Sequence, residues 1–115
     1  MVLAALVSAC GSRNANEAVE ASAEVLQDLP GNYTLKSSVD GNVRYSTAIV
    51  SEIAKGEYQI SRVTVYGPVL YGFKLGEHAS VESAELGSGA VTYQRGLKKT
   101  TIRFEKGGSL CELSK

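Results

Sequence analysis

The sequence predicts an all-β protein: a single antiparallel meander β-barrel of about eight strands, preceded by one short N-terminal helix. Three observations predict it. From Gly31 onward, Tyr, Val, Ile and Thr alternate with polar residues over short stretches. Glycine-containing turns recur roughly every 8–12 residues, a spacing typical of sandwiches and barrels. The connections are mostly short enough to join neighbouring strands, and closure of such a meander removes its exposed edges.

The strands are expected in order along the chain. Asp40-Gly41 is a strong hairpin signal between the first two. In the third, Tyr58 and Ile60 have one parity and Val63 and Val65 the other, which predicts a bulge near Ser61-Arg62. The expected strands cover residues 32–38, 43–50, 58–65, 69–75, 79–86, 90–94, 98–105 and 110–114.

A helix is predicted over residues 16–29, capped by Asn16 and ended by Pro30-Gly31. One side carries Ala18, Ser22, Val25, Leu26 and Leu29 at helical spacing. A second stripe is acidic, with Glu17, Glu20, Glu24 and Asp28, and is interpreted as a solvated surface that suits the helix dipole.

The amino-acid composition excludes several classes of function. The 115 residues support one domain, and 43% hydrophobic against 21% charged residues exclude a disordered chain. Twelve basic and twelve acidic side chains give no net charge, which argues against a general nucleic-acid binder. One His and two Cys are too few for a zinc site built from these ligands, which needs three or four.

The first ten residues are an apolar run that ends in Val7-Ser8-Ala9-Cys10. This pattern resembles the lipobox of bacterial lipoproteins, in which the signal is removed and the Cys becomes the lipidated N-terminus. The resemblance implies a signal-peptide remnant (residues 1–9), a lipidated Cys10 with a polar tether (10–16) and a barrel domain with its helix (17–115). Acyl chains on Cys10 would hold the protein in the membrane.

The overall pattern is similar to small lipoproteins of Bacteroides-type bacteria, which implies attachment to the periplasmic side of the outer membrane. The alternative for Cys10 is an ordinary thiol, which leaves open a disulfide with Cys111. Cys111 otherwise is interpreted as a small buried residue, in phase with Leu113.

The sequence shows no recognisable set of catalytic residues. We therefore expect that the protein is not an enzyme and that it uses no metal or cofactor. His78 is the single imidazole and lies in a turn beside Glu77, and no Gly-x-Ser-x-Gly nucleophile turn is present. The glycines lie at predicted hairpins, without a glycine-rich loop before a helix to bind phosphate.

Two surfaces are candidates for binding. Six aromatic side chains spread over the strands either line a ligand cavity or fill the interior: Tyr33, Tyr45, Tyr58, Tyr71, Phe73 and Tyr93. A basic strip near the C-terminus either protects a sheet edge or contacts an anionic partner: Arg95, Lys98, Lys99, Arg103 and Lys106.

Leu29-Pro30-Gly31-Asn32-Tyr33 resembles the Gly-x-Trp opening of lipocalin-like (calycin) barrels, with Tyr33 in place of Trp. In that family a short helix precedes the glycine and the aromatic residue closes one barrel end. The resemblance implies a small apolar ligand or a lipid in the barrel, in a cavity of about 300 Å³ or more.

Ser88-Gly89-Ala90-Val91-Thr92-Tyr93, followed by Lys106-Gly107, is similar to the Ser-Gly-x-x-Tyr and Lys-Gly elements of periplasmic lysozyme inhibitors, with one extra residue before Tyr93. This resemblance implies an alternative function as a protein-binding module or envelope-complex subunit. Ser88 and Lys106 would be the contacts, presented by loops around residues 87–96 and 106–108. Under either hypothesis we expect a monomer.

Overall fold

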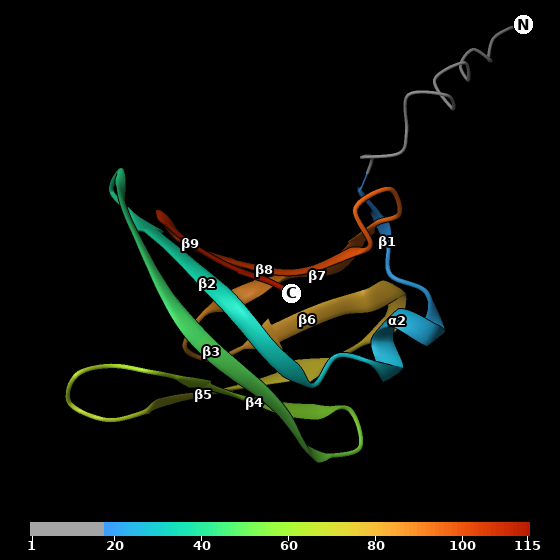
Figure 1. The fold of residues 1–115 in the computed structure, drawn as a ribbon, viewed down its shortest axis with the longest axis horizontal. Coiled ribbons are helices and arrows are strands. Elements are labelled where there is room, and N and C mark those ends of the chain that lie inside the picture. The colour runs from blue at the N-terminus through green and yellow to red at the C-terminus, as the bar shows by residue number, and fades with distance from the viewer. Residues whose placement is uncertain (1–17) are drawn as a thin grey trace, which may run out of the picture.

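The computed structural model describes residues 18–115 (Figure 1). The predicted signal remnant, Cys10 and its tether lie outside these residues. The described elements are β1 (Ala18–Glu20), α2 (Ala23–Gln27), β2 (Gly31–Val39), β3 (Asn42–Ala54), β4 (Glu57–Arg62), β5 (Val69–Leu75), the 3-10 turn η2 (Glu77–Ala79), β6 (Ser80–Ser83), β7 (Gly87–Gln94), β8 (Lys99–Lys106) and β9 (Ser109–Ser114).

The strands form a closed antiparallel barrel. Each strand from β2 to β9 pairs with the next along the chain, and β9 returns to pair with β2 from Thr34↔Ser114 to Val39↔Ser109. This arrangement confirms the predicted eight-strand meander with one short helix near its N-terminus. The barrel is compatible with a lipocalin-like fold. β1 lies outside the ring, where it pairs with β7.

The helix is shorter than the sequence predicts. Residues 18–20, expected to be helical, form β1 instead, and α2 has five residues. β6 pairs with β7 only as far as Ala90, and β1 pairs with β7 beyond it, from Thr92 to Gln94. Strand pairing with a distant segment therefore overrides the local helical pattern. The helix is capped by the Ser22 hydroxyl, which accepts from the Val25 N–H at 3.4 Å, and the predicted cap Asn16 lies outside the described residues.

The predicted bulge near Ser61-Arg62 is wrong. β4 runs without a register shift and ends at Arg62, and the irregularity lies in β3 between Glu52 and Ala54. Val63 and Val65 differ in parity from Ile60 because they follow the end of the strand, in the exposed β4–β5 loop. The Asp40-Gly41 hairpin is confirmed, and both residues have positive φ (51° and 84°), as a type I′ turn requires.

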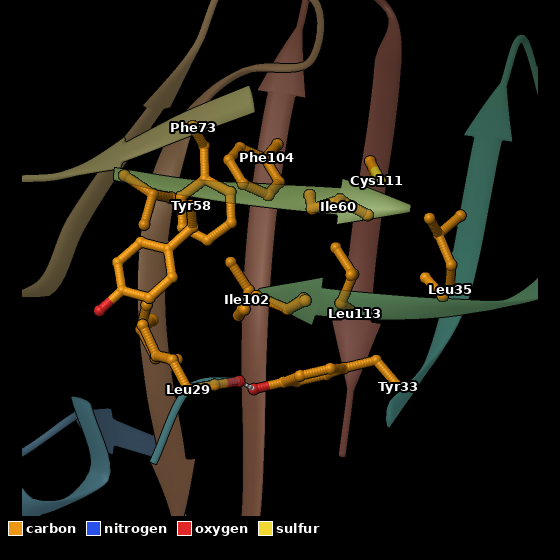
Figure 2. Close-up of a cluster of buried hydrophobic side chains, with 14 of the residues drawn as sticks. Leu29, Tyr33, Leu35, Tyr58, Ile60, Phe73, Ile102, Phe104, Cys111 and Leu113 are labelled. Atoms are coloured by element: carbon orange, nitrogen blue, oxygen red, sulfur yellow. Dashed lines mark hydrogen bonds between the residues drawn. The ribbon is translucent and has the colours of Figure 1, made fainter. Parts of the chain in front are cut away.

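The middle of the barrel is filled by its own side chains (Figure 2). Tyr58 stacks on Phe73 with ring centroids 5.2 Å apart, and Phe104 meets Phe73 edge-on at 5.4 Å. Aliphatic residues complete this core: Leu35, Val50, Ile60, Val91, Ile102 and Leu113. Because interiors pack at close to crystal density, the space between these rings and the aliphatic side chains is occupied by the protein itself.

One end of the barrel, here called the closed end, is covered by the segment that joins α2 to β2. Leu29 is fully buried there, and its carbonyl accepts a hydrogen bond from the Tyr33 hydroxyl at 2.5 Å (Figure 2). The Lys115 ammonium donates to the carbonyls of Asp28 (2.5 Å) and Pro30 (2.9 Å) and lies 5.6 Å from the centre of the Tyr33 ring. Tyr33 thus lies at a barrel end, as the lipocalin-like resemblance implies.

At the start of β7, the backbone comes unusually close to β8. A Cβ atom on Gly89 would lie 1.7 Å from the Arg103 carbonyl oxygen, and one on Gly87 would lie 2.0 Å from that of Glu105. Only glycine fits at these two strand positions. Gly87-Ser88-Gly89 resembles a turn in the sequence, but it begins strand β7, where the two glycines allow close strand contact.

We expect Gly89→Ala to lower the free energy of unfolding by at least about 2 kcal/mol, because β7 and β8 must separate to admit the methyl group. Gly72→Ala is the matched control, since the nearest atom to its added Cβ is the Tyr58 carbonyl oxygen at 3.9 Å. Urea denaturation of both variants measures the difference. Equal stability of the two variants would contradict the close contact.

Candidate functional site at the barrel mouth

The end opposite to the closed end is open, and a cavity of about 250 Å³ lies in it. We call it the mouth cavity. Its walls come from five strands and from the β6–β7 turn, so it forms only when the barrel closes. The lining residues are Leu35, Ser37, Val39, Arg62, Tyr71, Glu85, Leu86, Lys106, Ser109, Leu110 and Cys111.

Arg62 is the most informative of these residues. It is the last residue of β4, in phase with the buried Tyr58 and Ile60, so its side chain starts on the inner face. One terminal nitrogen, Nη1, donates to the Tyr71 hydroxyl at 3.4 Å. Its Nε is buried and has no hydrogen-bond partner within residues 18–115. Burying such a donor without a partner costs about 1–3 kcal/mol, so the group needs an explanation.

The other charged groups of the mouth cavity do not neutralise Arg62. The Lys106 ammonium donates to the Ala84 carbonyl at 3.0 Å, across the turn between β6 and β7. Glu85 is the lining carboxylate and accepts from the Ser83 hydroxyl at 3.4 Å. No cation of residues 18–115 comes within ion-pair distance of Glu85. The mouth cavity therefore holds two cationic side chains and one carboxylate.

Cys111 lies at the base of the mouth cavity and is buried. Burial raises the pKa of its thiol to about 11, while Arg62 opposes the shift and Glu112 adds to it. A thiol with a raised pKa is a poor nucleophile at neutral pH. This position agrees with the interpretation of Cys111 as a small buried residue, and the disulfide alternative involves Cys10, outside the described residues.

The six predicted ligand-binding aromatics do not line one cavity. Tyr71 alone among them lines the mouth cavity. Tyr58 and Phe73 belong to the core and also line a separate, open hollow of about 530 Å³. Tyr33 lies at the closed end, and Tyr93 lines a shallow surface hollow beside α2. Tyr45 faces outward from β3 with 68% of its surface exposed. Alternation alone does not reveal which face of β3 points inward, and Ala48 and Val50 occupy the inner one.

Ser88 and Lys106, the residues that the lysozyme-inhibitor resemblance implies, lie on strands. Ser88 is exposed within β7, opposite Glu105, because the segment predicted as a loop from residue 87 is a strand as far as Gln94. That loop prediction is wrong for residues 87–89, whereas residues 90–94 were also expected as a strand and form one. Lys106 ends β8 and faces the mouth cavity.

Among residues 18–115, His78 is exposed and no metal site is found. His78 has 84% of its side chain exposed and lies 4.0 Å from Glu20. No group of three His, Cys, Asp or Glu side chains is placed to hold a metal ion in this part of the chain. The described residues also contain no helix with the length and apolar character to cross a membrane.

The predicted basic strip is not continuous. Arg103 lies between two carboxylates on the outer face, 4.0 Å from Glu105 and 3.9 Å from Glu112. Lys106 turns inward at the mouth, whereas Arg95 and Lys98 lie at the β7–β8 turn at the closed end. The strip therefore divides into separately placed charges.

Comparison with known proteins adds no relative. No family model, curated protein or solved structure matches the chain. The candidate site therefore depends on the residues of this chain alone.

The raised pKa of Cys111 makes stability depend on pH. The folded state favours the protonated thiol, so its contribution is complete below the unfolded pKa of 9.0 and is lost as pH rises towards the folded pKa of about 11. We expect the free energy of unfolding to fall less steeply between pH 9 and about 11 in Cys111→Ala than in the wild type. Urea denaturation across this pH range measures the free energy of unfolding of both proteins. Equal slopes of that free energy against pH would contradict the raised pKa of Cys111.

Proposed function

We propose that this chain is a non-catalytic binding protein that takes a small molecule in the mouth cavity. The observation that carries the proposal is a filled barrel whose open end keeps about 250 Å³ of space between apolar and polar side chains. Most ligand pockets start at about 300 Å³, so this ligand is small. The ligand also meets polar walls, which favours an amphipathic molecule among the small apolar ligands and lipids that the lipocalin-like resemblance implies.

Apolar side chains near the open end support this proposal. Val65 and Tyr66, in the β4–β5 loop, have 93% and 98% of their surfaces exposed. Val39 and Val69, at the ends of β2 and β5 beside the mouth cavity, are also exposed. Exposed apolar groups that gather near an opening are typical of ligand entrances.

A pair of neighbouring serines allows a test. Ser37 lines the mouth cavity, whereas Ser38 has the opposite parity on β2. We expect 1-hexanol to shift the amide resonances of the mouth residues in a titration followed by NMR. Ser37→Phe fills the cavity and should weaken binding by at least about tenfold, whereas Ser38→Phe should leave binding unchanged. Resonance shifts at other places only, or unaltered binding by Ser37→Phe, would contradict the proposal.

We also propose that Cys10 is lipidated and anchors the protein to the periplasmic side of the outer membrane. The proposal is supported by Val7-Ser8-Ala9-Cys10 and by the small and polar residues that follow. In cells that express the native gene, an alkyne analogue of palmitate should label the wild type and Cys111→Ser equally. Cys10→Ser should lose the label and leave the membrane fraction, and labelled Cys10→Ser would contradict the assignment.

The alternative as a lysozyme inhibitor or envelope-complex subunit stays a prediction. The position of Ser88 within a strand gives it no added support.

A further inference from the structure

We infer that the ligand of the mouth cavity carries a carboxylate, which Arg62 and Tyr71 receive, on a short apolar chain. The inference rests on the proposed function and names the chemical class of its ligand. It comes from four observations: a buried donor without a partner, a hydroxyl beside it, the charge balance of the walls and the size of the space.

The first observation is the position of Arg62. A guanidinium with a buried Nε is unfavourable on the inner face of a strand unless its donors are satisfied. Residues 18–115 supply one contact, at 3.4 Å from Nη1 to the Tyr71 hydroxyl. A carboxylate matches the fork of a guanidinium, because its two oxygens can accept from two nitrogens at once.

The second observation is the Tyr71 hydroxyl. It accepts from Arg62, so its own O–H remains able to donate. Tyr71 and Arg62 both line the mouth cavity, from the adjacent strands β5 and β4. An anion beside the guanidinium would therefore meet a neutral donor and a charged one together.

The third observation is the charge of the walls. Lys106 adds a second cation at the mouth, bound to a backbone carbonyl rather than to a carboxylate. Glu85 offsets one of the two positive charges of Arg62 and Lys106, but it forms no ion pair with a cation of the described residues. The excess of one positive charge favours an anionic ligand over a neutral one.

The fourth observation concerns size and the apolar walls. At about 30 Å³ for each water molecule in the liquid, 250 Å³ corresponds to about eight water-sized groups. Hexanoate has eight non-hydrogen atoms. The aliphatic side chains of Leu35, Val39, Leu86 and Leu110 line the space and would contact its hydrocarbon chain.

The test titrates hexanoate, 1-hexanol and acetate into the ¹⁵N-labelled protein and follows the amide and Arg Nε–H signals. We expect hexanoate to bind at least about tenfold more tightly than 1-hexanol, which lacks the charge, and than acetate, which lacks the chain. The Arg62 Nε–H signal, identified by its loss in Arg62→Met, should move with hexanoate. In Arg62→Met the preference over 1-hexanol should disappear, and it should persist in the control Arg95→Met, at the exposed β7–β8 turn.

The outcomes separate the two proposals. Equal binding of hexanoate and 1-hexanol, or an unmoved Arg62 Nε–H signal, would overturn the carboxylate inference and leave binding in the mouth cavity intact. If acetate binds as well as hexanoate, the inference that the ligand carries an apolar chain would be overturned. Binding of none of the three would overturn the proposed function as well. Should Arg62→Met fail to fold, the wild-type Nε–H signal still decides. Arg62→Lys keeps the charge without the fork and should reduce the preference for hexanoate.

Discussion

The carbonyl groups of the segment between α2 and β2 set the constraint on which the barrel depends. Those of Asp28, Leu29 and Pro30 lie at the closed end, and the carbonyl of the buried Leu29 would be costly there without a donor. The Tyr33 hydroxyl, in β2, and the ammonium of Lys115, the last residue, supply the donors. This contact joins the segment before β2 to Lys115, which follows β9, beside the β2–β9 pairing that completes the ring. Because this segment covers one end of the barrel, the mouth cavity lies at the other end.

Local patterns predicted the parts of this fold that local physics decides. Alternation and turn residues gave the strand count and the Asp40-Gly41 hairpin, because both depend on neighbours in sequence. The helix was overestimated because residues 18–20 find a partner more than 70 residues away, in β7. The same limit explains Gly87 and Gly89, which look like turn residues until β8 is placed beside them.

The candidate site was harder to predict, since the mouth cavity combines residues of five strands whose register no local pattern provides. Of the six predicted aromatics, only Tyr71 reaches it. A signal for Arg62 was nevertheless present in the sequence. It follows Tyr58 and Ile60 at alternate positions, so a charged residue continues an inward-facing row. Val63 and Val65, however, have the opposite parity to Ile60, and this change was interpreted as a bulge near Arg62.

The opposite placement of the mouth cavity and of β1 decides which way an anchored barrel would face. β1 lies beside the end of β7 near the closed end. The eight peptide steps from Cys10 to Ala18 reach at most about 28 Å, close to the length of one eight-residue strand. With Cys10 in the bilayer, so short a tether would hold the closed end towards the lipid and turn the mouth to the periplasm. The proposed ligand would then enter the mouth from the aqueous phase and not from the membrane.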